Sequence, residues 1–122
     1  MPKSDCQRRF TEVFALGAAG CTGGLVNIVP GLMVDIHRCC AVGRSTDAAV
    51  SAARMIELGR VIDQLAFPSN VAAGLAARGF SPGASKSILS RATRALSARV
   101  ESELRALFVQ WGLMLGPASA AA

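Results

Sequence analysis

The feature that most constrains the fold is a stretch of 22 residues without a charged side chain, residues 13–34. As one helix it would be about 33 Å long, close to the thickness of a bilayer's hydrocarbon core. The stretch also contains five glycines, Asn27 and Pro30. Proline lacks the amide hydrogen that a helix interior needs. We therefore expect one helix to end near Ile28 and another to begin at Pro30 and stop at Gly43.

The composition predicts an all-α fold. Apolar residues make up 52% of the chain and charged residues 17%, tyrosine is absent and there is one tryptophan. Alanine, leucine and arginine favour helices, whereas strands favour aromatic and β-branched residues. The charged share lies below the usual figure of about 25%, which argues against disorder. We predict one domain over residues 1–122, a small bundle or hairpin of about four to five helices.

A second segment, residues 47–66, has apolar residues at helical spacing. One face of such a helix would carry Ala48, Ala52, Met55, Leu58, Ile62 and Leu65. Residues 45–47 offer polar side chains for its N-terminal cap. We therefore predict an amphipathic helix over 47–66, with Met55 and Ile62 among the residues that pack against other helices.

The C-terminal third of the chain predicts a short helix over 71–78, a turn at GFSPG (79–83) and a long basic amphipathic helix over 85–115. Ser85 is the expected cap of the long helix and Gly116–Pro117 its expected stop. Its apolar stripe would consist of Ile88, Ala92, Leu96, Val100, Leu104, Phe108 and Trp111.

The glycines of residues 13–34 suggest close helix packing. Gly20 and Gly24 form a GxxxG pair, and Gly17 precedes them by one turn. Small residues at this spacing let two helix backbones approach closely. We predict that Gly17, Gly20 and Gly24 line such a contact.

The same segment leaves three alternatives open: a membrane-associated segment, a buried core segment, or an export signal. The run from Arg8-Arg9 to Cys21 is similar to the end of a bacterial lipoprotein signal peptide. Glu12 and the shortness of the apolar run before Cys21 argue against a signal, because a leader has a basic start and a longer apolar core. The signal is therefore the least favoured of the three.

No motif in the chain predicts catalysis or metal binding. In GFSPGASKS two residues separate Gly83 from Lys86, whereas a phosphate-binding loop has lysine directly after the last glycine. The single histidine, His37, lies beside Cys39 and Cys40 without zinc-site spacing. Together with Cys6 and Cys21, these cysteines are expected to be buried free thiols. We expect no catalytic residue, no cofactor, no metal site and no small-molecule substrate, so the chain is not predicted to be an enzyme.

The net charge is +5, carried by eleven arginines and two lysines. A basic balance suits anionic partners, although a solvated polar face is the commoner outcome. The residues on the polar side of 85–115 that could contact such a partner are Lys86, Arg91, Arg94, Arg99 and Arg105. Nucleic acid is the less favoured anion, because Phe108 and Trp111 lie on the apolar stripe and not among the arginines.

These observations lead to a hypothesis about function. The chain is expected to be a membrane-associated structural, accessory or assembly protein that packs on other protein helices in a homo- or hetero-oligomer. An anionic membrane is a further candidate partner. The alternative is a cytoplasmic oligomeric helical adaptor or a viral or phage structural protein, and a basic nucleic-acid-binding module ranks third.

Overall fold

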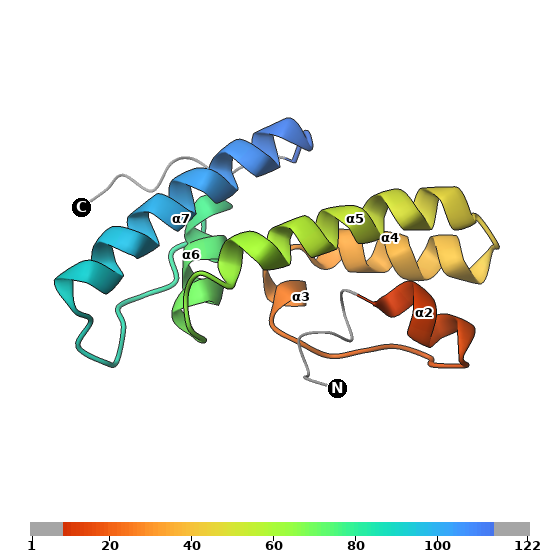
Figure 1. Ribbon diagram of the computed structural model, residues 1–122, viewed down its shortest axis with the longest axis horizontal. Helices are drawn as coiled ribbons and strands as arrows, with labels where there is room; N and C mark the ends of the chain where they lie inside the picture. Colours follow the sequence, from red (N-terminus) through yellow and green to blue (C-terminus); the bar gives the residue numbers. More distant parts are fainter. Residues whose placement is uncertain (1–8, 114–122) are drawn as a thin grey trace. The chain divides into compact units, whose positions relative to one another are not determined.

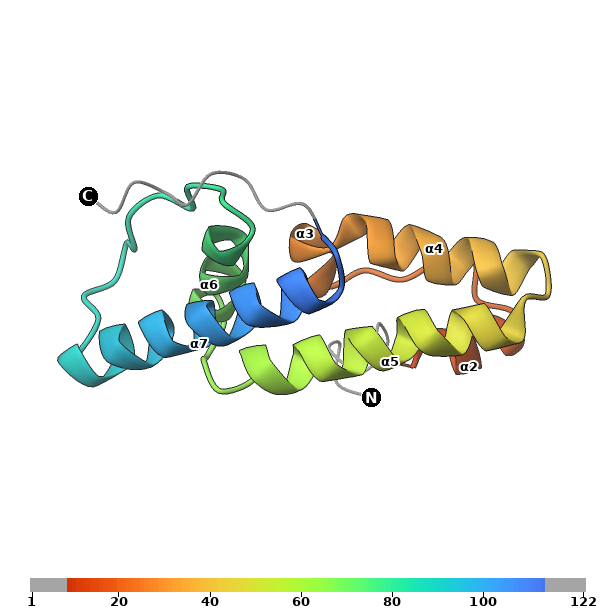
Figure 2. The same cartoon turned by 90° about the horizontal axis from the view of Figure 1, so that it is seen from above.

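The computed structural model describes residues 9–113, and the chain divides into two compact units, Met1–Gly59 and Arg60–Ala122. Within the described residues all regular structure is helical, in six helices without a strand (Figures 1 and 2). The all-α prediction is confirmed, with one helix more than the four to five expected. The division into two units is not a feature that the sequence analysis predicts.

In the first unit, two short helices, α2 (Phe10–Ala15) and α3 (Leu25–Ile28), pack against the longer α4 (Pro30–Ala41). The unit also contains the first part of α5 (Ser45–Ile62). α4 and this part of α5 run side by side in opposite directions (Figures 1 and 2). α2 packs on α4 through three rings: Phe10 is buried, and the Phe14 ring meets the His37 ring edge-on with centroids 5.6 Å apart.

The uncharged segment 13–34 is not one helix. α3 ends at Ile28 and α4 begins at Pro30, as the sequence predicts. α2 already ends at Ala15, and the chain from Leu16 to Gly24 is irregular. Among the described residues, no helix has both the length and the apolar character that crossing a bilayer requires.

Gly17 ends α2 instead of lining a helix contact. Its φ is +98°, outside helical backbone. Its amide donates to the Phe14 carbonyl oxygen at 2.9 Å and the Ala18 amide to that of Val13 at 3.1 Å. This pair of hydrogen bonds is the Schellman motif, which suits glycine because the left-handed backbone strains other residues. Gly20 lies outside any helix, and Gly24 directly precedes α3. None of the three glycines therefore lies within a helix, as the predicted contact between two helices would require.

Three more helices end with the same pair of hydrogen bonds. The glycines concerned, all at positive φ, are Gly43 after α4, Gly79 after α6 (Ser69–Ala77) and Gly112 after α7 (Arg91–Gln110). The stop at Gly43 matches the prediction. The last helix, in contrast, ends well before the predicted stop at Gly116–Pro117, which lies outside the described residues.

The second unit, in its described residues, is built on the packing of α6 against α7. Val100, Leu104 and Phe108 of α7 are completely buried. Facing them, α6 buries only small residues, Ala73, Gly74 and Ala77. Small residues on one helix let the other approach closely, so a short helix can cover the apolar stripe of a long one.

Two polar contacts lie at the edges of the packing between α6 and α7. The Arg78 guanidinium lies over the Phe108 ring, 5.9 Å from its centroid. Gln64 Nε2 donates to Glu103 Oε2 at 3.0 Å, which ties the turn after α5 to α7. Both contacts join segments that flank α6 to the same long helix.

The start of the long helix was predicted wrongly. Ser85, the predicted cap, instead bonds locally: its Oγ accepts from the Ser87 amide at 3.2 Å and donates to the Ser87 carbonyl oxygen. Ser90 caps α7, with its Oγ accepting from the Thr93 amide at 3.0 Å. Serine hydroxyls that bond to nearby backbone compete with helix formation. Ile88, predicted on the apolar stripe, is therefore in the loop and fully exposed.

The predicted apolar face of 47–66 is confirmed. All six of its members are buried: Ala48, Ala52, Met55, Leu58, Ile62 and Leu65. The helix itself spans Ser45–Ile62, beginning and ending earlier than predicted. The early start has a local cause, since the Arg44 carbonyl accepts from the Ala48 amide and its guanidinium pairs with Asp47 at 2.6 Å. α6, predicted over 71–78, begins two residues earlier and ends one earlier.

Two isoleucines on α5 test this face. Ile62 is 4% exposed and Ile56 is 37% exposed. We expect Ile62→Ala to lower the free energy of unfolding by roughly 2–4 kcal/mol, because it removes buried methylene groups and leaves a cavity. Ile56→Ala should cost under about 1 kcal/mol. Equal losses in urea titrations of the two variants would contradict the assignment of the buried face.

Two glycines separate helix termination from helix packing. An added Cβ meets no atom within 4 Å at Gly17 or at Gly20, but only Gly17 has positive φ. We expect Gly17→Ala to destabilise the protein by about 1 kcal/mol and Gly20→Ala to be neutral or slightly stabilising. Thermal unfolding measures both. Comparable destabilisation by the two variants would instead favour a close glycine-lined contact.

Candidate interaction surface

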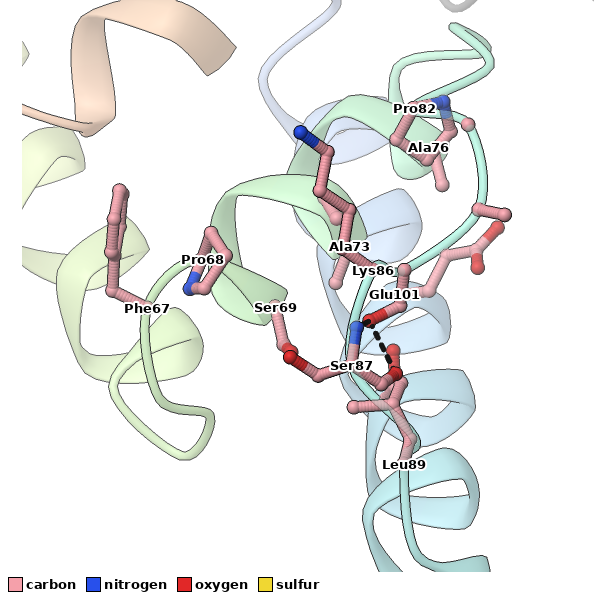
Figure 3. Close-up of a pocket in the computed structure, with 15 residues that line it drawn as sticks. Phe67, Pro68, Ser69, Ala73, Ala76, Pro82, Lys86, Ser87, Leu89 and Glu101 are labelled. Carbon is pink, nitrogen blue, oxygen red and sulfur yellow. Dashed lines mark hydrogen bonds between the residues drawn. The ribbon is translucent and has the colours of Figure 1, made fainter.

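An open groove of about 640 Å³ lies in the second unit between α6, the loop 78–90 and α7 (Figure 3). Its size is in the range of ligand-binding clefts. The residues that line it are Phe67, Pro68, Ser69, Ala72, Ala73, Ala76, Pro82, Gly83, Ala84, Ser85, Lys86, Ser87, Leu89, Ser97 and Glu101.

Small side chains make the groove, and large exposed ones stand beside it. α6 contributes Ala72 and Ala76, which leave room that longer side chains would fill. The Phe67 side chain at the groove is 76% exposed. Ile88 lies between the lining residues Ser87 and Leu89 and is completely exposed. Exposed apolar side chains around a cleft are typical of protein interaction sites.

Two charged side chains of opposite sign line the groove, Lys86 from the loop and Glu101 from α7. Their ends point to different sides in Figure 3. Within residues 9–113, neither side chain forms an ion pair or a hydrogen bond. The groove therefore offers one basic and one acidic group to a partner.

The arginines of α7 do not line the groove. Arg91 and Arg94 are exposed and Arg105 is half-buried. At 100° per residue these three lie within about 60° of one another around the helix, beside the buried stripe and on the same side as Glu101, with exposed Arg99 about 80° beyond Arg91. No ion pair within the described part of the chain includes any of the four. Of the predicted basic set, Lys86 lines the groove and the four arginines do not, although Arg94 and Arg105 lie on the same side of α7 as Glu101.

The sequence pattern does not predict the groove. Phe67 and Pro68 follow the predicted helix 47–66 directly, and Glu101 is not among the residues predicted to contact a partner. Two signals were present: a phenylalanine outside any apolar stripe, and small residues repeated at Ala72, Ala73 and Ala76. Met55 and Ile62, which were predicted to pack, are core residues and not part of this surface.

The cysteines form no candidate site. The Cys21 thiol donates to Met33 Sδ at 3.9 Å, which ties the irregular segment to α4. Cys39 and Cys40 are free and half-buried on α4, and Cys6 lies outside the described residues. Burial, and then the neighbouring Cys39 thiol, raises the pKa of Cys40 and so disfavours its nucleophilic thiolate. Nowhere in residues 9–113 do three metal-ligating side chains cluster.

No family model, curated protein or solved structure matches this chain. The groove and the arginines of α7 are therefore the features from which a function can be inferred.

Proposed function

We propose that this chain is a helical interaction protein that receives apolar side chains of another protein in the groove of its second unit. The observation that carries the proposal is the exposure of Phe67 and Ile88 beside a groove lined by alanines and prolines. Burying one large apolar side chain is worth roughly 1.5–3 kcal/mol. Two such side chains would therefore contribute roughly 3–6 kcal/mol to binding.

Packing inside the second unit favours protein as the partner of this surface. An amphipathic helix that lies in lipid inserts its apolar stripe into the acyl boundary. In α7, however, Val100, Leu104 and Phe108 are already buried. The large apolar side chains that the described part of the second unit leaves exposed are Phe67, Phe80 and Ile88, and Val109 on α7.

A photo-crosslinking amino acid tests this proposal in cells. Placed at Ile88, it should give discrete protein adducts, whereas the same group at Val50, an exposed residue of α5, should not. Filling the groove with Ala76→Leu should suppress the adducts at position 88. Denaturing gels and mass spectrometry measure both. Equal adducts at the two positions, or adducts that Ala76→Leu leaves unchanged, would refute the proposal.

A second candidate function is contact with an anionic membrane surface through Arg91, Arg94, Arg99 and Arg105. It is favoured by the gathering of these arginines on the solvent side of α7 without carboxylate partners. Each basic side chain near an anionic surface contributes about 1 kcal/mol, or roughly fivefold in affinity.

Vesicle flotation tests this second surface. The protein should float with vesicles that contain phosphatidylglycerol and not with vesicles of phosphatidylcholine alone. Arg91→Gln with Arg94→Gln should weaken flotation by roughly 25-fold in affinity, whereas Arg60→Gln on α5 should change it little. Binding to both vesicle types alike would refute the arginine surface. Competition by duplex DNA, lost steeply as salt rises, would favour nucleic acid instead.

A further inference from the structure

The groove is self-complementary, which identifies a partner for it. It carries one basic and one acidic side chain, Lys86 and Glu101, neither of which has an ion-pair partner among the described residues. It also combines a cleft lined by alanines with exposed Phe67 and Ile88, the kind of side chains that such a cleft accepts. The same surface therefore carries a basic and an acidic group, and it carries both a cleft and apolar side chains that could enter such a cleft.

Twofold symmetry requires this kind of surface. In a symmetric dimer, each residue that contacts a second residue across the interface makes the same contact twice, with the roles of the two copies exchanged. A groove with one lysine and one glutamate then forms two ion pairs across the interface. A partner of a different kind would need its own acidic and basic groups at matching positions.

We propose that a second copy of this chain occupies the groove, so that Lys86 of each copy pairs with Glu101 of the other and Ile88 of each enters the opposite cleft. This rests on the proposed function, that the groove receives apolar side chains of a protein, and it names that protein.

Charge reversal tests the pairing without disturbing the core, since Lys86 is exposed and Glu101 is half-buried. Sedimentation velocity of the full chain at low ionic strength should show a concentration-dependent dimer. Lys86→Glu alone and Glu101→Lys alone should each weaken it about tenfold or more, because each variant places like charges together twice. An equimolar mixture of the two variants should restore the dimer, because both contacts then join a glutamate to a lysine.

A matched control is available on α7. Arg99→Glu changes the charge by the same amount as Lys86→Glu but lies outside the groove lining, and it should not weaken the dimer as much. Ile88→Ser gives an independent variant, because a fully exposed loop residue can change without loss of the fold. It should weaken the dimer even at high salt, where the charge reversals have less effect.

The outcomes separate this inference from the proposed function. Failure of the mixed variants to restore the dimer would overturn the paired geometry, even if each variant alone were monomeric. An oligomer insensitive to all groove variants would place self-association elsewhere and overturn the inference. A monomeric wild-type chain with adducts to a different protein at Ile88 would overturn it too, while the proposed function would stand. A monomer without groove adducts would overturn both.

Discussion

The second unit depends on the close packing of α7 against the small residues of α6. Ala73, Gly74 and Ala77 add little volume, so α7 can approach α6 closely, and Val100, Leu104 and Phe108 of α7 are completely buried. Two consequences follow. The apolar stripe of α7, the most conspicuous pattern in the sequence, is no longer available to a partner. Two further small residues of α6, Ala72 and Ala76, line the groove.

Glycines set the lengths of the helices. The helices that stop at Gly17, Gly43, Gly79 and Gly112 all close with the same two hydrogen bonds and a left-handed residue, which satisfies carbonyl groups that a helix end leaves unpaired. In the first unit, the early stop at Gly17 leaves a short α2, and its Phe10 and Phe14 rings pack with His37 of α4. Glycine spacing that resembles a membrane-helix contact is therefore, at Gly17, a signal for the end of a helix.

The sequence allowed prediction of those parts of the fold that depend on periodicity and on proline. The buried face of α5, the break between Ile28 and Pro30 and the stop at Gly43 all follow from local pattern. The boundaries of α7 did not, because Ser85 and Ser90 both suit a helix cap and only the backbone around them decides between them. The groove could not be predicted, because it forms where Phe67, the loop and α7 meet, and these are distant in sequence. Of the predicted basic set, only Lys86 lies at that groove, and the functions assigned to either surface remain proposals.

The packing of α6 on α7 describes a prefolded unit with a groove, not an amphipathic helix that folds only on its partner. Hydrogen exchange of the isolated chain, followed by mass spectrometry, tests this distinction most directly. Amides between Val100 and Phe108 should be among the slowest to exchange in the second unit, and adding anionic vesicles should leave them unchanged, because buried packing protects them already. Rapid exchange of this segment in the isolated chain, with protection that appears only when vesicles are added, would contradict the account.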